Sequence, residues 1–369
     1  GTTQNYNLSF QQQFGGTSVY SSLSRWNDRS IIPGNKLERT NLTTRATTRF
    51  GKDNRWTSDV KFSYNNTSGF NRPINGRDVS NIFVLYNMPR SMDIRDFAAA
   101  TNEFGNMLWY QGAPGWQNNP YWNNKYNLNQ DTRDRFIMTG SVKYAFTSWL
   151  DAELRAGGDI YTTNTQRKVY AGSNRANEYS EGKQTFTETN YSALLTAKKD
   201  NVVGKFGGVI TAGGNLMHQR FSSLGISTGP LEVPNVFSLT NGQGAPGISQ
   251  GYSRKKINSL YGSVGVNYDG YLYLDATFRN DWSSALIEEN RSYFYPSVSF
   301  AWVVTDMLEK MGTHIPGWFD YAKLRVSHAS VGNDLAPYSL YNGYEIRKDP
   351  NNNTYAVRNS LLKDENVKS

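Results

Sequence analysis

Residues 255–268, KKINSLYGSVGVNY, and residues 271–279, YLYLDATFR, decide the fold class of this chain. Apolar and polar side chains alternate along both segments, and in the first one Leu260, Val264 and Val266 share one parity whereas Ser259, Ser263 and Asn267 have the other. A β-strand points successive side chains to opposite sides, so this period gives one apolar and one polar face. Asp269-Gly270 between the segments is a tight hairpin signal. Long hairpins with one charge-free face are typical of outer-membrane β-barrels.

The same alternation recurs along the chain and predicts antiparallel strands throughout. We expect twelve strands, at residues 3–14, 17–27, 37–50, 55–67, 132–146, 148–164, 184–199, 203–220, 253–268, 270–283, 292–305 and 321–332. In four of them, 55–67, 148–164, 270–283 and 321–332, the charged residues fall together on the polar face. Because a charge in lipid costs a few kcal/mol, this face is expected to line a lumen. The sequence therefore predicts an all-β fold that is part of an antiparallel transmembrane β-barrel.

Short and long connections alternate between the predicted strands. The short ones include Gly15-Gly16, Thr147-Ser148 and Asp269-Gly270, whereas the long ones are residues 28–36, 68–131, 166–183, 221–252 and 284–291. Outer-membrane barrels have short periplasmic turns and long external loops. We therefore assign residues 1–332 to barrel strands with long extracellular loops, and residues 333–369 to an extracellular loop leading into the next strand.

The connection at residues 68–131 is too long to be a plain linker, so we expect it to be functional. A short helix is expected inside it near Ser80–Met88, and another near Asp306–Met311 in a longer periplasmic connection. The second half of the long loop mixes aromatic rings with amides, which suit the faces and hydroxyl pairs of sugars. The candidate substrate contacts are Trp109, Tyr110, Trp116, Asn118, Asn119, Tyr121 and Trp122. The alternative role for these side chains is to pack the loop onto its neighbours.

Composition narrows the class of protein further. The 369 residues carry a net charge of +8 but no cysteine, which excludes disulfides, thiolate metal sites and cysteine nucleophiles. The basic residues are scattered rather than gathered in a stripe, so we expect no nucleic-acid partner. No apolar run approaches the roughly 20 residues of a spanning helix. Aromatic residues make up 14% of the chain, enough to supply interfacial belts.

No pattern in the sequence indicates catalysis, a cofactor or a metal. The histidines, His218, His314 and His328, are far apart, and metal sites need several convergent ligands. Residues 349–353 resemble a calcium loop but have no bidentate glutamate at the expected place. Arg279 and Asp281 near the outer end of one strand are candidates to line a substrate path, with mutual structural pairing as the alternative. We therefore expect a protein that is not an enzyme.

An ordered series of short segments is similar to the barrel of SusC/RagA-type TonB-dependent outer-membrane transporters. The matching segments are NPYW (119–122), DTRDRF (131–136), TSWL (147–150), PNVFSL (234–239), RKKINSLYG (254–262), RNDWSS (279–284), YPSVSFAW (295–302), LRVS (324–327), VGN (331–333) and LKDENVKS (362–369). The last segment departs from the family pattern in having Asp364 where the family has proline. The series runs along nearly the whole chain.

The resemblance implies a 22-stranded barrel with an N-terminal plug, energised by TonB and lidded by a SusD-like surface lipoprotein. We therefore expect this chain to be an internal barrel fragment, with the plug, the TonB contact and the C-terminal strands outside it. The implied function is active import of bulky nutrients, oligosaccharides or peptides, across the outer membrane of a Gram-negative bacterium.

Two other functions fit parts of the pattern. A soluble all-β carbohydrate-active or carbohydrate-binding protein would also be rich in aromatic residues, but its strands would average about 5–6 residues. A plain diffusion porin would share the alternation, but the long loops and the ordered series of motifs argue against it.

Overall fold

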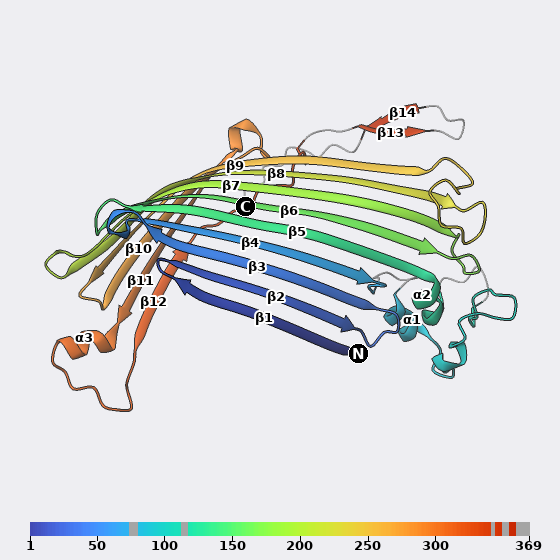
Figure 1. Cartoon of the computed structure of the whole chain (residues 1–369), viewed down its shortest axis with the longest axis horizontal. Helices are drawn as coiled ribbons and strands as arrows, with labels where there is room; N and C mark the ends of the chain where they lie inside the picture. The colour runs from blue at the N-terminus through green and yellow to red at the C-terminus, as the bar shows by residue number, and fades with distance from the viewer. Residues whose placement is uncertain (74–79, 112–116, 341–343, 349–353, 359–369) are drawn as a thin grey trace.

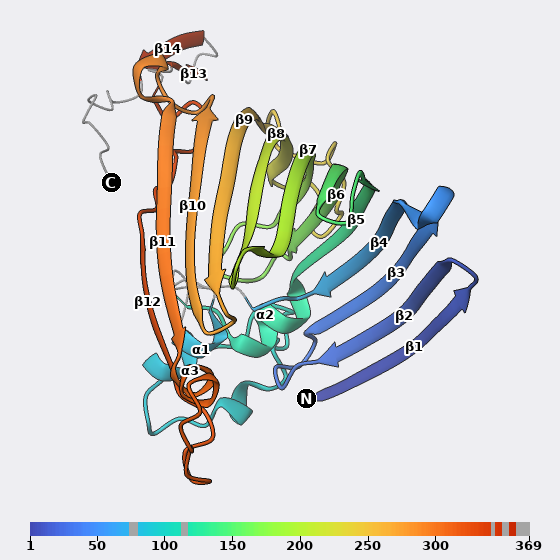
Figure 2. The same cartoon turned by 90° about the vertical axis from the view of Figure 1, so that its left-hand side faces the viewer.

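One antiparallel sheet of twelve strands dominates the part of the chain that the structure describes, and its strands follow one another in chain order from β1 to β12. The structure is a computed structural model that describes residues 1–73, 80–111, 117–340, 344–348 and 354–358. Strands β1 to β9 run side by side along the length of the molecule, and β10 to β12 run obliquely at its left-hand end (Figure 1). The sheet curves across its width, so that β1 and β12 form its two margins (Figure 2).

The predicted strands are all present. Their bounds are β1 Thr2–Phe14, β2 Thr17–Arg29, β3 Lys36–Phe50, β4 Trp56–Phe70, β5 Asn127–Ala145, β6 Leu150–Val169, β7 Glu178–Val203, β8 Phe206–Pro230, β9 Gly247–Tyr268, β10 Leu272–Ser283, β11 Ser292–Val303 and β12 Lys323–Ala329. The prediction was wrong mainly at the loop ends of β5 to β9, which extend further than expected. The fold class, an antiparallel barrel sheet, is confirmed.

Short helices and one extra hairpin interrupt the connections. The helices are α1 Asn81–Asn87, α2 Pro120–Tyr126 and α3 Val304–Lys310, with 3-10 turns η1 Lys52–Asn54, η2 Ile94–Phe97 and η3 Glu288–Asn290. Helices α1 and α3 confirm the two predicted helical segments, whereas α2 was not predicted. A separate two-stranded sheet, β13 Tyr344–Lys348 and β14 Thr354–Arg358, lies in the segment that was expected to be loop. None of the helices that the structure describes is long and apolar enough to cross a membrane.

The register keeps each face of the sheet consistent from strand to strand. Ser141 of β5 lies opposite Asp59 of β4 and Arg155 of β6, on what we call the polar face. Val142, one residue on, lies opposite Leu154 of β6 on the apolar face. Leucines of the apolar face are widely exposed, with Leu8 at 75%, Leu154 at 65% and Leu260 at 61%. A face this apolar and this open is suited to hydrocarbon rather than water.

Aromatic rings gather where the apolar face meets the short turns. Phe50 stacks on Trp56 at the β3–β4 turn, and the Trp56 ring lies 4.5 Å from that of Tyr144 on β5. Further along the same edge, the centroids of Phe206 and Tyr268 are 4.7 Å apart. Aromatic belts of this kind mark the membrane–water interface in outer-membrane barrels. The belt therefore indicates where the membrane ends on the short-turn side.

The β9–β10 turn shows how the short connections close. Asp269 and Gly270 both have positive φ, 51° and 73°, which Gly and Asp tolerate better than most residues. The Asp269 carboxylate accepts hydrogen bonds from the Nζ atoms of Lys205 and Lys310, at 2.7 and 2.9 Å. These two ammonium groups, Lys205 first, hold the pKa of Asp269 below its usual value. The carboxylate thus ties the β7–β8 turn and α3 to this turn.

Buried apolar residues concentrate at the opposite end, among the long connections. Val84, Ala100, Trp109, Trp122 and Leu231 are all at least nine-tenths buried. Figure 1 places α1 and α2 at this end of the sheet, and Figure 2 shows them within its curve. The long connections therefore have a small core of their own.

Candidate functional site

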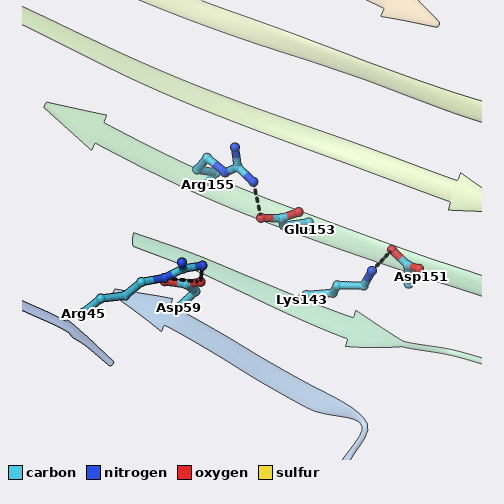
Figure 3. Close-up of polar contacts among 6 residues, drawn as sticks. All are labelled: Arg45, Asp59, Lys143, Asp151, Glu153 and Arg155. Carbon is cyan, nitrogen blue, oxygen red and sulfur yellow. Dashed lines mark hydrogen bonds and ion pairs between the residues drawn. The ribbon is translucent and has the colours of Figure 1, made fainter. Parts of the chain in front are cut away.

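Opposite charges pair across the polar face of β3 to β6 (Figure 3). The Arg45 guanidinium pairs with Asp59, whose Oδ1 lies 3.0 Å from Nε. Two more pairs follow on β5 and β6. The Nζ–Oδ1 distance of Lys143–Asp151 and the Nη2–Oε1 distance of Arg155–Glu153 are both 2.9 Å. Each charge in this group of six has an opposite partner, so this part of the wall is hydrophilic and its charges are locally compensated.

Arg279 and Asp281 lie on the same face further round the sheet. Arg279 Nε lies 2.7 Å from Asp281 Oδ1, and its Nη2 donates to Ser259 Oγ at 2.8 Å. The guanidinium also lies over the Tyr261 ring, 5.6 Å from its centroid. The two side chains therefore pair with each other, which was the alternative role. Their contact with a substrate stays a prediction.

Helix α2 anchors the second half of the long loop. Pro120 is its first residue and Asn119 its N-cap, a combination that favours helix initiation because the cap side chain bonds a free backbone N–H. Asn119 Oδ1 accepts from the Tyr121 N–H at 2.9 Å. Its Nδ2 donates to the carbonyl oxygens of Phe97 and Leu108, at 2.9 and 2.8 Å. Asn119 is 0% exposed, so one side chain joins three segments of the loop.

Aromatic packing completes this loop core. The Trp109 ring lies 5.0 Å from Phe97 in an edge-on arrangement and 4.7 Å from Tyr110. Trp122 is 1% exposed, and its ring lies 4.4 Å from Tyr126. Desolvation raises the pKa of the Tyr110 hydroxyl.

The structure divides the predicted loop contacts into groups. Trp109, Asn118, Asn119 and Trp122 are buried, and they pack the loop as the alternative role required. Tyr110 and Tyr121 are half-buried and retain surface that a substrate can reach. Trp116 lies outside the described residues. The stated role of these residues as substrate contacts stays a prediction.

A half-buried ion pair that the sequence does not indicate fixes the chain after β12. Lys255 Nζ on β9 lies 2.6 Å from Asp334 Oδ1, with only 15% and 13% of the two side chains exposed. Asp334 Oδ2 accepts from Ser283 Oγ, also at 2.6 Å. Asp334 follows the predicted family segment at 331–333, but nothing in that segment indicates its partner.

No group of three or more His, Asp or Glu side chains that could hold a metal occurs within the described part of the chain. The calcium-like segment at residues 349–353 lies outside the described residues.

The comparisons with known proteins agree with this architecture. No protein-family model matches the chain. The TonB-dependent receptor P26 of Formosa agariphila is 24% identical over 341 residues, which cover 87% of this chain and 32% of that protein. The structure of the RagAB peptide transporter aligns with a TM-score of 0.79 at 16% identity, over 97% of this chain and 40% of that one. The RagAB importer in its closed-closed state gives a TM-score of 0.76 at 17% identity.

At these identities the solved structures establish the fold. The chain spans about a third of the curated relative and two fifths of the RagAB chain that it matches. The similarity therefore does not by itself establish the activity, the substrates or the partners of the whole protein.

Proposed function

Because the chain has the barrel fold of SusC/RagA-type TonB-dependent transporters, we propose that it forms wall and loops of an active importer in the outer membrane of a Gram-negative bacterium. The importer takes bulky nutrients, oligosaccharides or peptides, with energy from TonB. A SusD-like surface lipoprotein assists it. In this arrangement residues 1–332 form barrel strands and extracellular loops, and residues 333–369 form a further extracellular segment.

The single observation that carries this proposal is the pair of unlike faces on one continuous sheet. The apolar face is exposed and bordered by an aromatic belt, whereas the polar face holds paired charges. In a barrel the first face meets lipid and the second lines the lumen. Paired charges suit a hydrophilic path because each is compensated locally and none repels a passing polar substrate.

The long loop supplies substrate contacts at the outer mouth in this proposal. Tyr110 and Tyr121 present partly exposed rings beside a buried core that fixes their positions. The core residues Trp109, Asn119 and Trp122 act by holding the loop in shape. Arg279 and Asp281 line the path deeper on the polar face.

The alternative, a soluble all-β carbohydrate-active protein, is disfavoured by strand length. β7 and β8 contain 26 and 25 residues, far beyond the average of about 5–6 in soluble sheets. A soluble sheet also covers its apolar face with a second layer, whereas the apolar face here is open over the strands. The proposed activity makes and breaks no bond, so the protein is not an enzyme.

The test is uptake by whole cells that express the full-length protein. We expect the protein to fractionate with outer membranes and to require detergent for extraction. Growth on its nutrient at limiting concentration should depend on the protein and on TonB. Extraction by salt or buffer alone, or uptake that persists without TonB, would contradict the proposal.

A further inference from the structure

A pocket in which asparagine is the commonest lining residue, beside four apolar side chains, lies at the loop end of the polar face. The β2–β3 connection, the start of the long loop, the end of α2 and the start of β5 all contribute to it. Seven asparagines and three arginines line it, and no aspartate or glutamate among the described residues does so. Asn129 and Arg167 lie directly opposite one another on β5 and β6, with the parity of the polar face. The pocket is therefore at the rim of the proposed lumen.

Hydrogen bonds between the asparagines make the wall of this pocket rigid. Asn81 Nδ2 donates to Asn124 Oδ1, and Asn127 Nδ2 donates to Asn123 Oδ1, both at 2.7 Å. Asn71 Nδ2 donates to the Asn124 carbonyl oxygen at 2.8 Å. These contacts join α1, α2 and the first residues of β5, so the wall is preorganised for a ligand.

Two carboxamide oxygens in the wall have no partner. The Oδ1 atoms of Asn35 and Asn127 are both buried without a hydrogen bond, and Asn35 as a whole is only 6% exposed. Buried polar atoms are nearly always satisfied, because burial removes the water that would otherwise bond them. A ligand hydroxyl would satisfy either amide in either orientation, since a hydroxyl both donates and accepts.

The charges of the pocket favour an anion. Arg72 is neutralised by Asp131 in a two-point contact, with Nε–Oδ1 at 2.6 Å and Nη2–Oδ2 at 2.8 Å. Arg167 pairs with no acid among the described residues. A guanidinium binds a carboxylate through two parallel hydrogen bonds, so Arg167 is suited to that group. A metal cation is disfavoured by the same positive charge.

We propose that this pocket is a subsite for a uronate, a sugar residue that carries a carboxylate beside several hydroxyls. The proposal rests on the importer function and narrows its substrate to acidic oligosaccharides. Asn35 and Asn127 accept from sugar hydroxyls, and Arg167 binds the carboxylate. A peptide terminus would also offer a carboxylate, and its N–H groups could donate to the same two oxygens, so the binding experiment includes a peptide whose tighter binding would contradict the proposal.

Binding to the full-length protein in detergent tests this proposal. The probes are tetramers of galacturonate and of glucuronate, each compared with its carboxyl-reduced counterpart, and tetra-alanine as the peptide. The variants are Arg167→Gln and Asn35→Leu. Arg133→Gln is the matched control, because Arg133 lies on the same face of β5, donates to Thr163 Oγ1 at 2.8 Å and does not line the pocket. Retention of the heat-modifiable, folded band on gels verifies each variant.

We expect at least one acidic tetramer to bind about tenfold tighter than its reduced form, the range of a charge-assisted pair. Arg167→Gln should abolish this difference in affinity, whereas Arg133→Gln should retain it. Asn35→Leu should weaken the binding of both the acidic and the reduced tetramer. Equal binding of acidic and reduced tetramers, or tighter binding of tetra-alanine, would overturn the proposal. Uptake that still depends on TonB in those cases would leave the importer function standing, so the two failures are distinguishable.

Discussion

Gly140 offers a direct measurement of which face of the sheet meets lipid. It lies on the apolar face of β5, four residues from both Phe136 and Tyr144. At about 3.3 Å per residue and a tilt near 40°, each aromatic ring is roughly 10 Å away along the membrane normal. That is close to half of an apolar band about 25 Å tall, so Gly140 lies near the midplane.

The substitution Gly140→Arg measures the free-energy cost of placing a charged side chain in the membrane. A Cβ at this position meets nothing within 4 Å, so steric strain does not contribute. Arginine at the midplane of a barrel costs about 2–4 kcal/mol. Replacing a strand glycine returns roughly 0.5–1 kcal/mol. We therefore expect a net loss of about 1–3.5 kcal/mol in the free energy of folding into the bilayer.

Two variants serve as controls for Gly140→Arg. Ser141→Arg places the same side chain on the polar face between Asp59 and Arg155, where water solvates the charge and the cost should be smaller than at Gly140. Gly140→Leu keeps the position but stays apolar, and it should be neutral or stabilising. The assay is reversible urea unfolding of the full-length protein from lipid vesicles, followed by tryptophan fluorescence. Equal destabilisation by the two arginines, or by Gly140→Leu, would refute the assignment of the faces.

Three further predictions concern single contacts. Asn119→Ala should cost the long loop about 1 kcal/mol from the lost cap, and limited proteolysis between β4 and β5 should accelerate while the strands stay protected. Asp269→Asn should lower the melting temperature near neutral pH, where the carboxylate pairs with Lys205. Because the pKa of Asp269 is lowered in the folded chain, the gap between parent and variant should narrow as pH falls below about 4. Asp334→Asn should cost about 1.5–3 kcal/mol by leaving Lys255 half-buried without its acid, and hydrogen exchange should rise after β12.

Strand positions were predictable because one physical constraint acts on every strand inside the membrane. Apolar side chains must alternate with polar ones along each strand there, and this period of two is visible in a single sequence. The loop end of β7 lacked this alternation. Residues 178–183, EYSEGK, continue β7 although they carry no apolar face. Beyond the membrane both faces meet water, so alternation is no longer required, and the prediction ended the strand too early.

The contacts of the long loop could not be predicted from the sequence for a different reason. Asn119-Pro120 is a local helix-start signal, and α2 begins there. The partners of that helix are a matter of tertiary structure. Asn71 meets Asn124, and Lys255 meets Asp334, across long stretches of chain. No period or spacing in a single sequence encodes such pairs.

The burial of the predicted rings follows from what a long loop needs to keep one shape. Ordering each residue costs backbone entropy of about 1–2 kcal/mol, which surface contacts alone do not offset. A loop outside the membrane gains nothing from lipid, so its own apolar groups must form a core. Trp109 and Trp122 are among its largest side chains, and both are buried. A ring-rich loop thus uses its largest rings for packing first, which leaves half-exposed rings such as Tyr110 and the proposed asparagine-rich pocket as the candidates for substrate recognition.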